Sequence, residues 1–326
     1  MFNRFCTRRK WFLAIVAGAL GTFTAGQAGY AQGTWTTLAP VSPSPAEGMT
    51  VGGVGQVIVS AYGFSPVPGN TNLTRLYNIS TDSWSTGAPA PLPARADAAS
   101  GDTTHGGFLY VIGGGNSGVA LSDLDRYDPV TDTWITLTQM PTARAGAAAA
   151  VIDDGIFVIG GRQSTSGPCS GGPYLDTVEK YDIDTDTWSA VALLPNQRSD
   201  LAAVAHGGKI YVFGGCSSTG VTDEVDVYDP QTNTWTTGAT PMPTRRASLV
   251  AGHSGDKVYA IGGTDGVSAS NKNEVYDIPS NSWSNASMTA PRQEAGVNSH
   301  GGRIYVVGGA TPAFGSSTNA NEVFKP

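Results

Sequence analysis

Residues 209–235 read K-I-Y-V-F-G-G-C-S-S-T-G-V-T-D-E-V-D-V-Y-D-P-Q-T-N-T-W. An apolar run ends in a glycine pair, a polar loop leads to a tyrosine, and a tryptophan follows seven residues later. The same order of features recurs along the chain. Six of its seven tryptophans stand at positions 35, 84, 134, 188, 235 and 283, which are 47 to 54 residues apart, and the seventh is Trp11 near the N-terminus. A period of this length indicates an array of similar supersecondary units.

Each unit is predicted to contain four strands. The first is small and apolar, as at residues 147–151 and 201–205, and the second is apolar on both faces, as at residues 210–213. The third strand ends near the tyrosine and the fourth carries the tryptophan. Strands with two apolar faces fit sheets that pack face to face around an axis. We therefore predict an all-β, six-bladed β-propeller, because a two-sheet sandwich would not repeat one signature of about 50 residues.

The two ends of the chain are incomplete in complementary ways. The last unit has a glycine pair and Phe324 at the tyrosine position, and it ends at Pro326 without a tryptophan. Trp35 has no unit before it. We expect the strand around Trp35 to complete the sixth blade, which leaves no sheet edge open. The predicted propeller domain spans residues 33–326.

Residues 1–28 have the features of a cleavable export signal. A basic stretch precedes an apolar run at residues 11–20 that is too short to span a bilayer. Cleavage is expected after Ala28, with Ala31 as the alternative. Residues 7–13, T-R-R-K-W-F-L, resemble a twin-arginine motif, and an ordinary basic signal of the general secretory type is the other interpretation. We expect a secreted or periplasmic protein without a transmembrane segment in its mature chain.

The charge of the chain limits the choice of partner. The formal net charge is −7, and it becomes −11 without residues 1–28, which carry four basic residues and no acid. A protein this acidic gains little from releasing the counterions of phosphates, so nucleic acid is not expected as a partner. A rigid closed ring of this kind is expected to be a monomer.

The Gly-Gly, Tyr and Trp signature at this period resembles the Kelch-repeat family over about residues 33–326. The first unit departs from it, with Ala61-Tyr62-Gly63 in place of the glycine pair. The resemblance implies the fold and leaves function open, since the family includes protein-binding adaptors, sugar oxidases and sugar epimerases. The oxidases use a copper centre with two histidines. Here the histidines occupy the short turn before the second strand, so we predict no metal and no cofactor; they are His105, His206, His253 and His300.

The loops between strands two and three share one face with the crossings between blades, here called the loop face. The opposite face, with the short turns, is called the turn face. The loops of the loop face vary in length, and variable loops on a rigid scaffold are common binding sites. Arginines begin five of the first strands on this face: Arg95, Arg144, Arg198, Arg246 (or its neighbour Arg245) and Arg292.

Two interpretations of these arginines stay open. In Kelch adaptors that resemble this chain, arginines at this position grip acidic peptides, and guanidinium groups suit carboxylates. Alternatively, they pair internally with acids that stand two residues before the tyrosine or phenylalanine: Asp125, Glu179, Asp226, Glu274 and Glu322. The first unit has Arg75 at the acidic position and Glu47 close to the arginine position, a reversal of sign that suggests pairing there too.

Three acids follow arginines at a spacing of two: Asp97, Asp200 and Glu294. This spacing on a strand places them on the same side as the arginines, around the channel. They could form a cation site or a general acid/base pair, or they could be solvated channel lining. The residues directly after the glycine pairs include no carboxylate, and Arg162 among them joins the candidate ligand-binding residues. We predict no catalytic residue.

Cys169 and Cys216 lie in loops of adjacent blades on the loop face, and we predict that they form a disulfide, since exported proteins meet oxidising conditions. The function we predict is a non-catalytic module that binds a protein or glycan ligand, possibly an acidic one. One alternative is a sugar-active enzyme, such as a sialic acid epimerase or mutarotase. The other is a structural surface repeat protein.

Overall fold

The computed structural model describes residues 33–326, apart from residues 68, 165–168, 170–171 and 312–315. The predicted signal at residues 1–28 lies outside this described part. The described residues form strands, turns and loops, and none of their segments is a helix long and apolar enough to cross a membrane.

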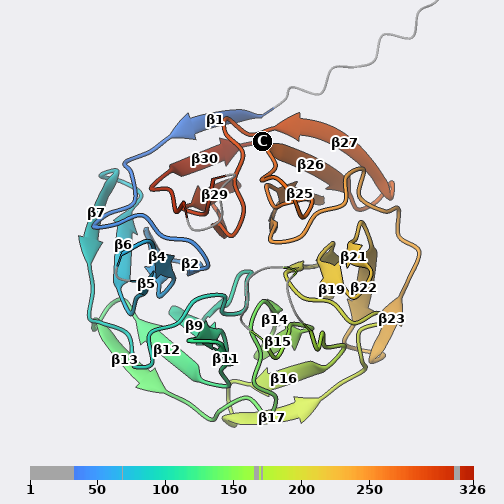
Figure 1. Cartoon of the computed structure of the whole chain (residues 1–326), viewed down its shortest axis with the longest axis horizontal. Helices are drawn as coiled ribbons and strands as arrows, with labels where there is room; N and C mark the ends of the chain where they lie inside the picture. The colour runs from blue at the N-terminus through green and yellow to red at the C-terminus, as the bar shows by residue number, and fades with distance from the viewer. Residues whose placement is uncertain (1–32, 68, 165–168, 170–171, 312–315) are drawn as a thin grey trace, which may run out of the picture. The chain divides into compact units, whose positions relative to one another are not determined.

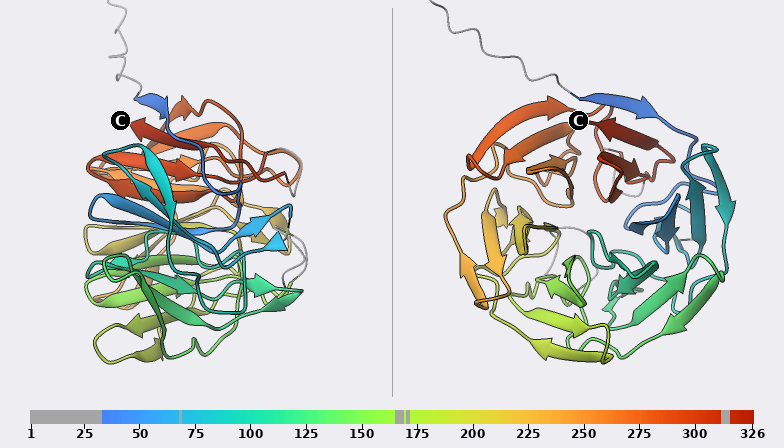
Figure 2. Two further views of the ribbon diagram at one scale, coloured as in Figure 1. Left: turned by 90° about the vertical axis from the view of Figure 1, so that its left-hand side faces the viewer. Right: turned by 180° about the vertical axis from the view of Figure 1, so that it is seen from behind.

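Six antiparallel four-stranded sheets stand around a central axis, as the sequence predicts (Figure 1). Figure 2 shows the same closed ring from the side and from behind. From the axis outward, the strands are as follows. Blade one has β2 (Thr50–Val54), β3 (Val57–Ala61), β6 (Thr74–Asn78) and β7 (Ser83–Thr86); blade two has β8 (Thr104–His105), β9 (Phe108–Ile112), β12 (Leu124–Asp128) and β13 (Thr133–Thr136); blade three has β14 (Ala148–Ile152), β15 (Gly155–Ile159), β16 (Val178–Asp182) and β17 (Thr187–Ala190); blade four has β18 (Ala202–His206), β19 (Lys209–Phe213), β22 (Val225–Asp229) and β23 (Thr234–Thr236); blade five has β24 (Val250–Ser254), β25 (Lys257–Ile261), β26 (Lys272–Asp277) and β27 (Ser282–Ser287); blade six has β28 (Gly296–His300), β29 (Arg303–Val307), β30 (Asn321–Lys325) and β1 (Thr34–Thr37).

The hydrophobic core lies between neighbouring blades. One apolar cluster joins Phe157 and Ile159 of blade three to Val212 and Tyr228 of blade four, and similar clusters fill the other interfaces. The second strand of each blade is buried on both faces because it contributes to two such clusters. The innermost strands carry small residues, as in the A-A-V-A-H of β18, since the blades converge there.

The tyrosine and tryptophan of the repeat lock each blade to the crossing that enters it. Tyr127 and Trp134 are cross-strand neighbours with ring centroids 4.8 Å apart. The Tyr127 hydroxyl donates to Asp132, whose carboxylate also accepts the Ala88 N–H from the crossing at 2.6 Å. The Trp134 Nε1 donates to the Ala88 carbonyl at 3.1 Å. The repeat signature of glycine pair, tyrosine and tryptophan does not include this position, which lies five residues after the tyrosine. It is an Asp here and an Asn in blades four and five.

The glycine pair lets one blade approach the backbone of the next. The Gly114 N–H donates to the Arg144 carbonyl of the following blade at 2.9 Å. A Cβ on Gly113 would lie only 2.6 Å from that carbonyl, and the φ of Gly113 is +63°, so both space and backbone conformation favour glycine. In blade one, Tyr62 holds the position of the first glycine at a φ of +62°, and its ring stacks under the Arg95 guanidinium at 4.3 Å.

The predicted closure of the ring is confirmed. Strand β1 pairs antiparallel with β30, and Trp35 lies opposite Phe324 with ring centroids 5.0 Å apart. The two strands lie side by side next to the C-terminus in Figures 1 and 2. The Trp35 Nε1 donates to the Ser287 carbonyl at 2.9 Å, so β1 does for blade six what the last strand does for every other blade.

Replacing Trp35 with alanine tests the closure, with Trp84→Ala in blade one as the matched control. Trp84 makes the equivalent contacts with Tyr77 and the Ala39 carbonyl. Both variants should lower the free energy of unfolding by about 2–4 kcal/mol, measured by urea denaturation, because each loses a packed indole. Only Trp35→Ala should accelerate thermolysin cleavage between β1 and β2. Equal cleavage of the two variants would contradict a special role for β1.

Candidate functional site

The five candidate arginines are engaged inside their own blades. Each guanidinium group is buried and pairs with the acid on the third strand of the same blade. The N–O distances are 2.6 Å for Arg95–Asp125, 2.6 Å for Arg144–Glu179 and 2.7 Å for Arg246–Glu274. Arg198 pairs with Asp226 and Arg292 with Glu322 in the same way. The structure thus favours internal pairing over a ligand-gripping ring, since buried and paired guanidinium groups are not offered to a ligand.

Two of the arginines also tie their strands to the glycine pair. Arg246 Nη1 donates to the Gly262 carbonyl at 2.7 Å, and Arg144 Nη1 donates to the Gly160 carbonyl at 2.9 Å. Burial lowers the pKa of Arg246 and Arg144, and the paired carboxylates oppose this shift. These side chains therefore hold the first three strands of a blade in register, which is a structural role.

The expected pairing of Arg75 with Glu47 in blade one is wrong. Arg75 Nη1 donates to the Tyr62 carbonyl at 3.1 Å, and burial lowers its pKa to about 10. The arginine position of this blade belongs to Ala46, whose carbonyl receives the Gly309 N–H. Glu47 is one residue further on, so its side chain points to the other side of the chain. It lies near Asp97 at the mouth of the channel instead.

Six equivalent residues, one from each blade, form a closed ring of backbone hydrogen bonds around the axis. The N–H of each donates to the carbonyl of its counterpart in the preceding blade at 2.6–3.0 Å, and Gly48 closes the ring on the carbonyl of Glu294. We call these residues the axial ring: Gly48, Asp97, Gly146, Asp200, Ser248 and Glu294. All six have a positive φ, between +50° and +62°. The three predicted acids therefore do meet at the channel mouth.

The axial ring borders a small pocket of about 50 Å³, partly open to solvent, which we call the axial pocket. Asp97, Asp200, Ser248 and Glu294 supply its polar groups. Its apolar lining comes from residues that lead into the innermost strands, among them Met49, Leu249 and Ala295. The Ser100 hydroxyl of blade two donates to the Leu201 carbonyl of blade four at 3.2 Å, so a segment of blade two reaches past blade three to blade four.

In blade three the axial-ring residue is Gly146, and the guanidinium group of Arg162 fills the space that a side chain at this position would take. Arg162 follows the glycine pair of that blade, and its guanidinium group is buried between Asp200 and Asp97, with an Nη2–Oδ2 distance of 3.1 Å to Asp97. A Cβ on Gly146 would collide with this guanidinium group. Burial alone would lower the pKa of Arg162. The charges of Asp200 and Asp97 outweigh this effect, so the pKa of Arg162 is raised.

The carboxylates of this region outnumber the single arginine that contacts them. Burial, followed by the neighbouring charge of Asp97, raises the pKa of Glu47 to about 7. Burial also raises the pKa of Glu294 well above its usual range, with repulsion from Asp97, Glu47 and Asp200 as the further causes. The pKa of Asp97 is raised by burial, although Arg162 opposes the shift. The axial pocket is therefore short of positive charge.

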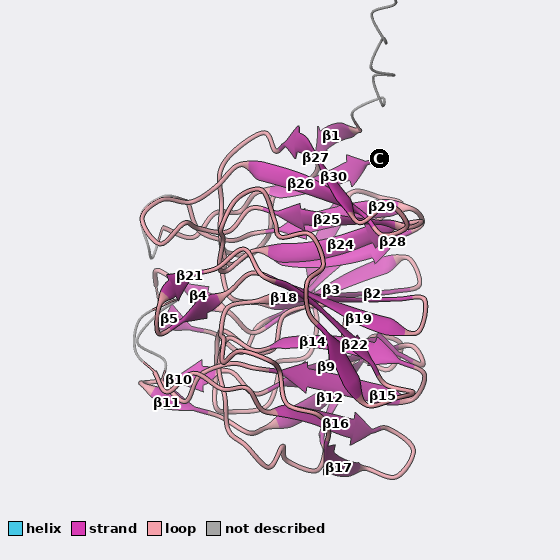
Figure 3. Cartoon of the chain, turned by 90° about the vertical axis from the view of Figure 1, so that its right-hand side faces the viewer, coloured by secondary structure: helices cyan, strands magenta, loops and turns pink. Residues whose placement is uncertain are grey.

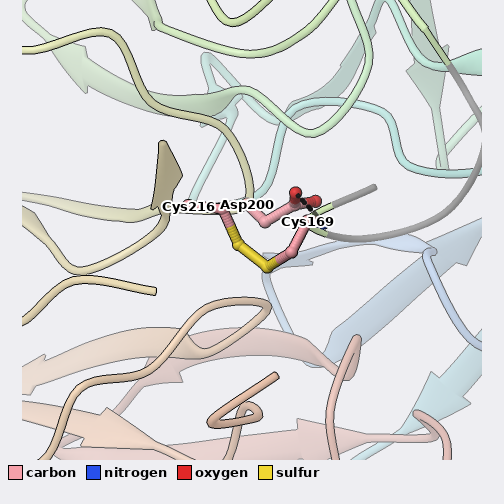
Figure 4. Close-up of side chains that lie close together, drawn as sticks. All are labelled: Cys169, Asp200 and Cys216. Atoms are coloured by element: carbon pink, nitrogen blue, oxygen red, sulfur yellow. Dashed lines mark hydrogen bonds between the residues drawn. A yellow bond between two sulfur atoms is a disulfide. The ribbon is translucent and has the colours of Figure 1, made fainter. Parts of the chain in front are cut away.

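The predicted disulfide is present beside the axial ring. Cys169 and Cys216 are bonded with Cα atoms 5.3 Å apart (Figure 4). The Cys169 N–H donates to Asp200 Oδ2 at 3.2 Å, so the disulfide holds the blade-three loop against the axial ring. The two cysteines and Asp200 lie close enough for a metal site, but both sulfur atoms are used by the disulfide and offer no thiolate.

The histidines lie on the turn face, as predicted. The His105 and His206 rings contact Asp154 and Asp256, each at 3.0 Å. The four histidines stand in four different blades, yet the His206 and His253 rings lie with centroids 5.8 Å apart. Burial, followed by the charge of His206, lowers the pKa of His253. A pocket of about 360 Å³, lined by His105 and His253 among others, opens here, and nothing in the repeat signature indicates it.

Removing one partner of a buried ion pair tests the structural role of the arginines. Arg246→Met leaves Glu274 buried and unpaired, which should lower the free energy of unfolding by about 3–5 kcal/mol in urea denaturation. The double variant Arg246→Met/Glu274→Leu should recover most of this loss, because no charge remains buried. A double variant as unstable as Arg246→Met alone would show that the ion pair is not the reason for the loss.

The raised pKa of Glu47 predicts a pH-dependent stability. The pKa of about 7 means that the folded protein holds this proton up to about pH 7, whereas the unfolded chain releases it near the ordinary glutamate pKa of 4.5. The contribution of this group is therefore greatest below pH 4.5 and is lost as the pH rises through 7. Glu47→Gln should raise the melting temperature above pH 7 and flatten its fall between pH 5 and 7.5. Asp184→Asn, at an exposed turn-face position, is the control, and a Glu47→Gln profile parallel to wild type would refute the assignment.

Comparisons with known proteins agree with this architecture. A family model described as the KLHDC2/KLHL20/DRC7 Kelch-repeats domain matches residues 136–309, more than half of the chain, and a Kelch motif model matches residues 98–141. Kelch-like protein 23 of Homo sapiens is 32% identical over 136 residues, which cover 42% of this chain and 23% of that protein. Kelch-like protein terF of Aspergillus terreus is 29% identical over 193 residues, covering 54% and 40%.

The chain thus spans about a quarter of the length of the human relative. Among solved structures, YjhT is similar with a TM-score of 0.74 and 20% identity, over 88% of this chain and 96% of that chain, a likeness that concerns the fold. The repeat signature, the six blades and the family-model match lead to one conclusion: the chain belongs to the Kelch-repeat family of β-propellers.

Proposed function

We propose that this Kelch propeller is an exported, non-catalytic binding module whose loop face recognises a protein partner. Membership of a family with protein-binding propellers supports the general function. The observation that carries the proposal is the apolar character of the projecting parts of the loop face.

Two-stranded hairpins project from this face (Figure 3). They are β4–β5 (Phe64–Ser65, Gly69–Asn70), β10–β11 (Gly115–Asn116, Val119–Ala120) and β20–β21 (Cys216–Ser217, Gly220–Val221). Exposed aliphatic side chains lie on these hairpins, on the blade-five loop and on the crossings: Val67, Leu92, Val119, Leu193 and Val267. Among the described residues, seven large apolar side chains are exposed, and five of them lie on this face, the other two being Val130 and Ile135. An excess of exposed apolar groups on one face is typical of protein interaction surfaces.

The disulfide supports an exported protein, because such bonds persist in oxidising compartments. The signal at residues 1–28, the secreted or periplasmic location and the monomeric state remain predictions from the sequence. So do a glycan ligand, the sugar-active enzyme and the structural surface protein. The exposed apolar side chains favour a protein partner over a glycan.

Aspartate substitutions on the two faces test the proposal. Peptides selected from a random display library against the wild-type protein should bind Val67→Asp and Val267→Asp at least tenfold more weakly in biolayer interferometry. Val130→Asp, at an equally exposed position (87%) in a turn of the turn face, is the matched control and should bind as wild type does. All three substitutions are on the surface and should leave the melting temperature unchanged.

Selected peptides that lose affinity only with Val130→Asp would place the binding surface on the turn face and contradict the proposal. A glycan array run in parallel separates the two ligand classes. Binding to glycans alone, lost with the loop-face variants, would overturn the choice of a protein partner.

A further inference from the structure

The two sides of the axial ring differ in charge balance. On one side, Arg162 neutralises Asp97 and Asp200. Glu294 comes from blade six. In the ring of six blades, blade six stands opposite blade three, which supplies Arg162. Glu47 is close enough that its charge helps to raise the pKa of Glu294. This side has two carboxyl groups and, within the part of the chain that the structure describes, no basic side chain paired with them.

Hydrogen-bond acceptors on this side lack partners among the described residues. Ser248 lines the axial pocket, is 8% exposed, and its hydroxyl has no hydrogen-bond partner. Glu47 Oε2 is likewise unpartnered, in a residue that is 5% exposed, and so is Glu294 Oε1. Buried polar atoms in proteins are almost always hydrogen-bonded, so the two of these atoms that belong to lining residues of the axial pocket, Ser248 Oγ and Glu294 Oε1, require a partner.

The walls of the axial pocket indicate what kind of donor fits. Met49, Leu249, Val250 and Ala295 line the same side as the unpartnered acceptors, so an apolar chain would pack there. An ammonium group has three N–H donors and no acceptor, and on a lysine it is carried by a four-carbon stem that packs against apolar surface.

A bare metal ion fits this side less well. The set of metal-type ligand atoms that lie within 4.8 Å of one another, among the residues described, is Cys169, Asp200 and Cys216. Glu47 and Glu294 do not belong to it. Among the described residues, this side therefore does not offer three convergent ligand atoms of the His, Cys, Asp or Glu type, whereas an elongated organic cation can also use the apolar walls.

We propose that the axial pocket binds a primary ammonium group carried on an alkyl chain, as a free alkylamine or as a lysine side chain of a protein partner. The formal net charge of −7 draws such a cation toward the protein. The lysine source rests on the proposed protein-binding function and names the group that the partner inserts. The free-amine source does not depend on that function.

Isothermal titration calorimetry of the purified protein with cadaverine and with a short lysine-containing peptide tests the proposal. 1-Pentanol and the same peptide with norleucine are the uncharged controls. Cadaverine should bind and 1-pentanol should not. Glu294→Gln should weaken cadaverine binding at least tenfold, Ser248→Ala about threefold, and Asp184→Asn, which removes the same charge from the turn face, less than twofold. The melting temperature of Glu294→Gln should equal or exceed that of wild type, because an uncompensated carboxyl group is removed.

Affinity should rise between pH 5.5 and 8 at constant ionic strength. Glu47, whose pKa burial raises to about 7, loses its proton over this range while the amine stays charged, and the other groups that face this site are Glu294, Asp97, Asp200 and Arg162. Binding of the peptide but not of cadaverine would assign the site to a partner's lysine, and binding of cadaverine alone would assign it to a free amine.

No binding of either probe, or equal binding by Glu294→Gln and wild type, would overturn the proposal. These outcomes are independent of the loop-face variants. A Val67→Asp or Val267→Asp protein that loses its selected peptides while no variant binds amines would leave the protein-binding function standing and remove this inference alone.

Discussion

The closed ring of six backbone hydrogen bonds at the channel mouth is the constraint on which this structure depends. Each bond joins one blade to the next, and the last joins Gly48 of blade one to Glu294 of blade six. A ring can close only if all six residues adopt the same left-handed backbone conformation, which is costly for a residue with a side chain. Four of the six positions nevertheless carry side chains. The ring thereby brings Asp97, Asp200, Ser248 and Glu294 to one point on the axis.

The charges of the propeller divide into two groups with different roles. The arginine and the acid of each blade from two to six neutralise one another inside the blade, where burial makes an unpaired charge expensive. At the axis the balance is different, since several carboxyl groups surround one arginine. Arg162 reaches Asp97 and Asp200 because Gly146 leaves room for its guanidinium group. No such group reaches Glu294 among the described residues. The mouth of the channel is thus acidic, although arginines begin five of the first strands on this face.

Much of the architecture could be predicted because the repeat recurs in register. The glycine pairs, tyrosines and tryptophans each perform the same local task in the blades that carry them, and the Phe324–Trp35 closure follows from the same pattern. Departures from the pattern were harder to interpret. The pairing of Arg75 with Glu47 failed because a shift of one residue turns a side chain to the other side of a strand. The proximity of His206 and His253 was missed because it depends on how closely adjacent blades converge.

The sequence by itself determined the number of blades, the closing strand, the loop face and the pair of cysteines able to form a disulfide. These follow from spacing, since each repeat contains its own strand pattern and turn residues. Only the tertiary structure decided which charges are satisfied. Arg162 of blade three pairs with Asp97 of blade two and Asp200 of blade four, whereas Glu294 of blade six faces the charges of Asp97, Glu47 and Asp200 without an ion-pair partner among the described residues. Their distances depend on the curvature of the whole ring, which no segment of the chain records.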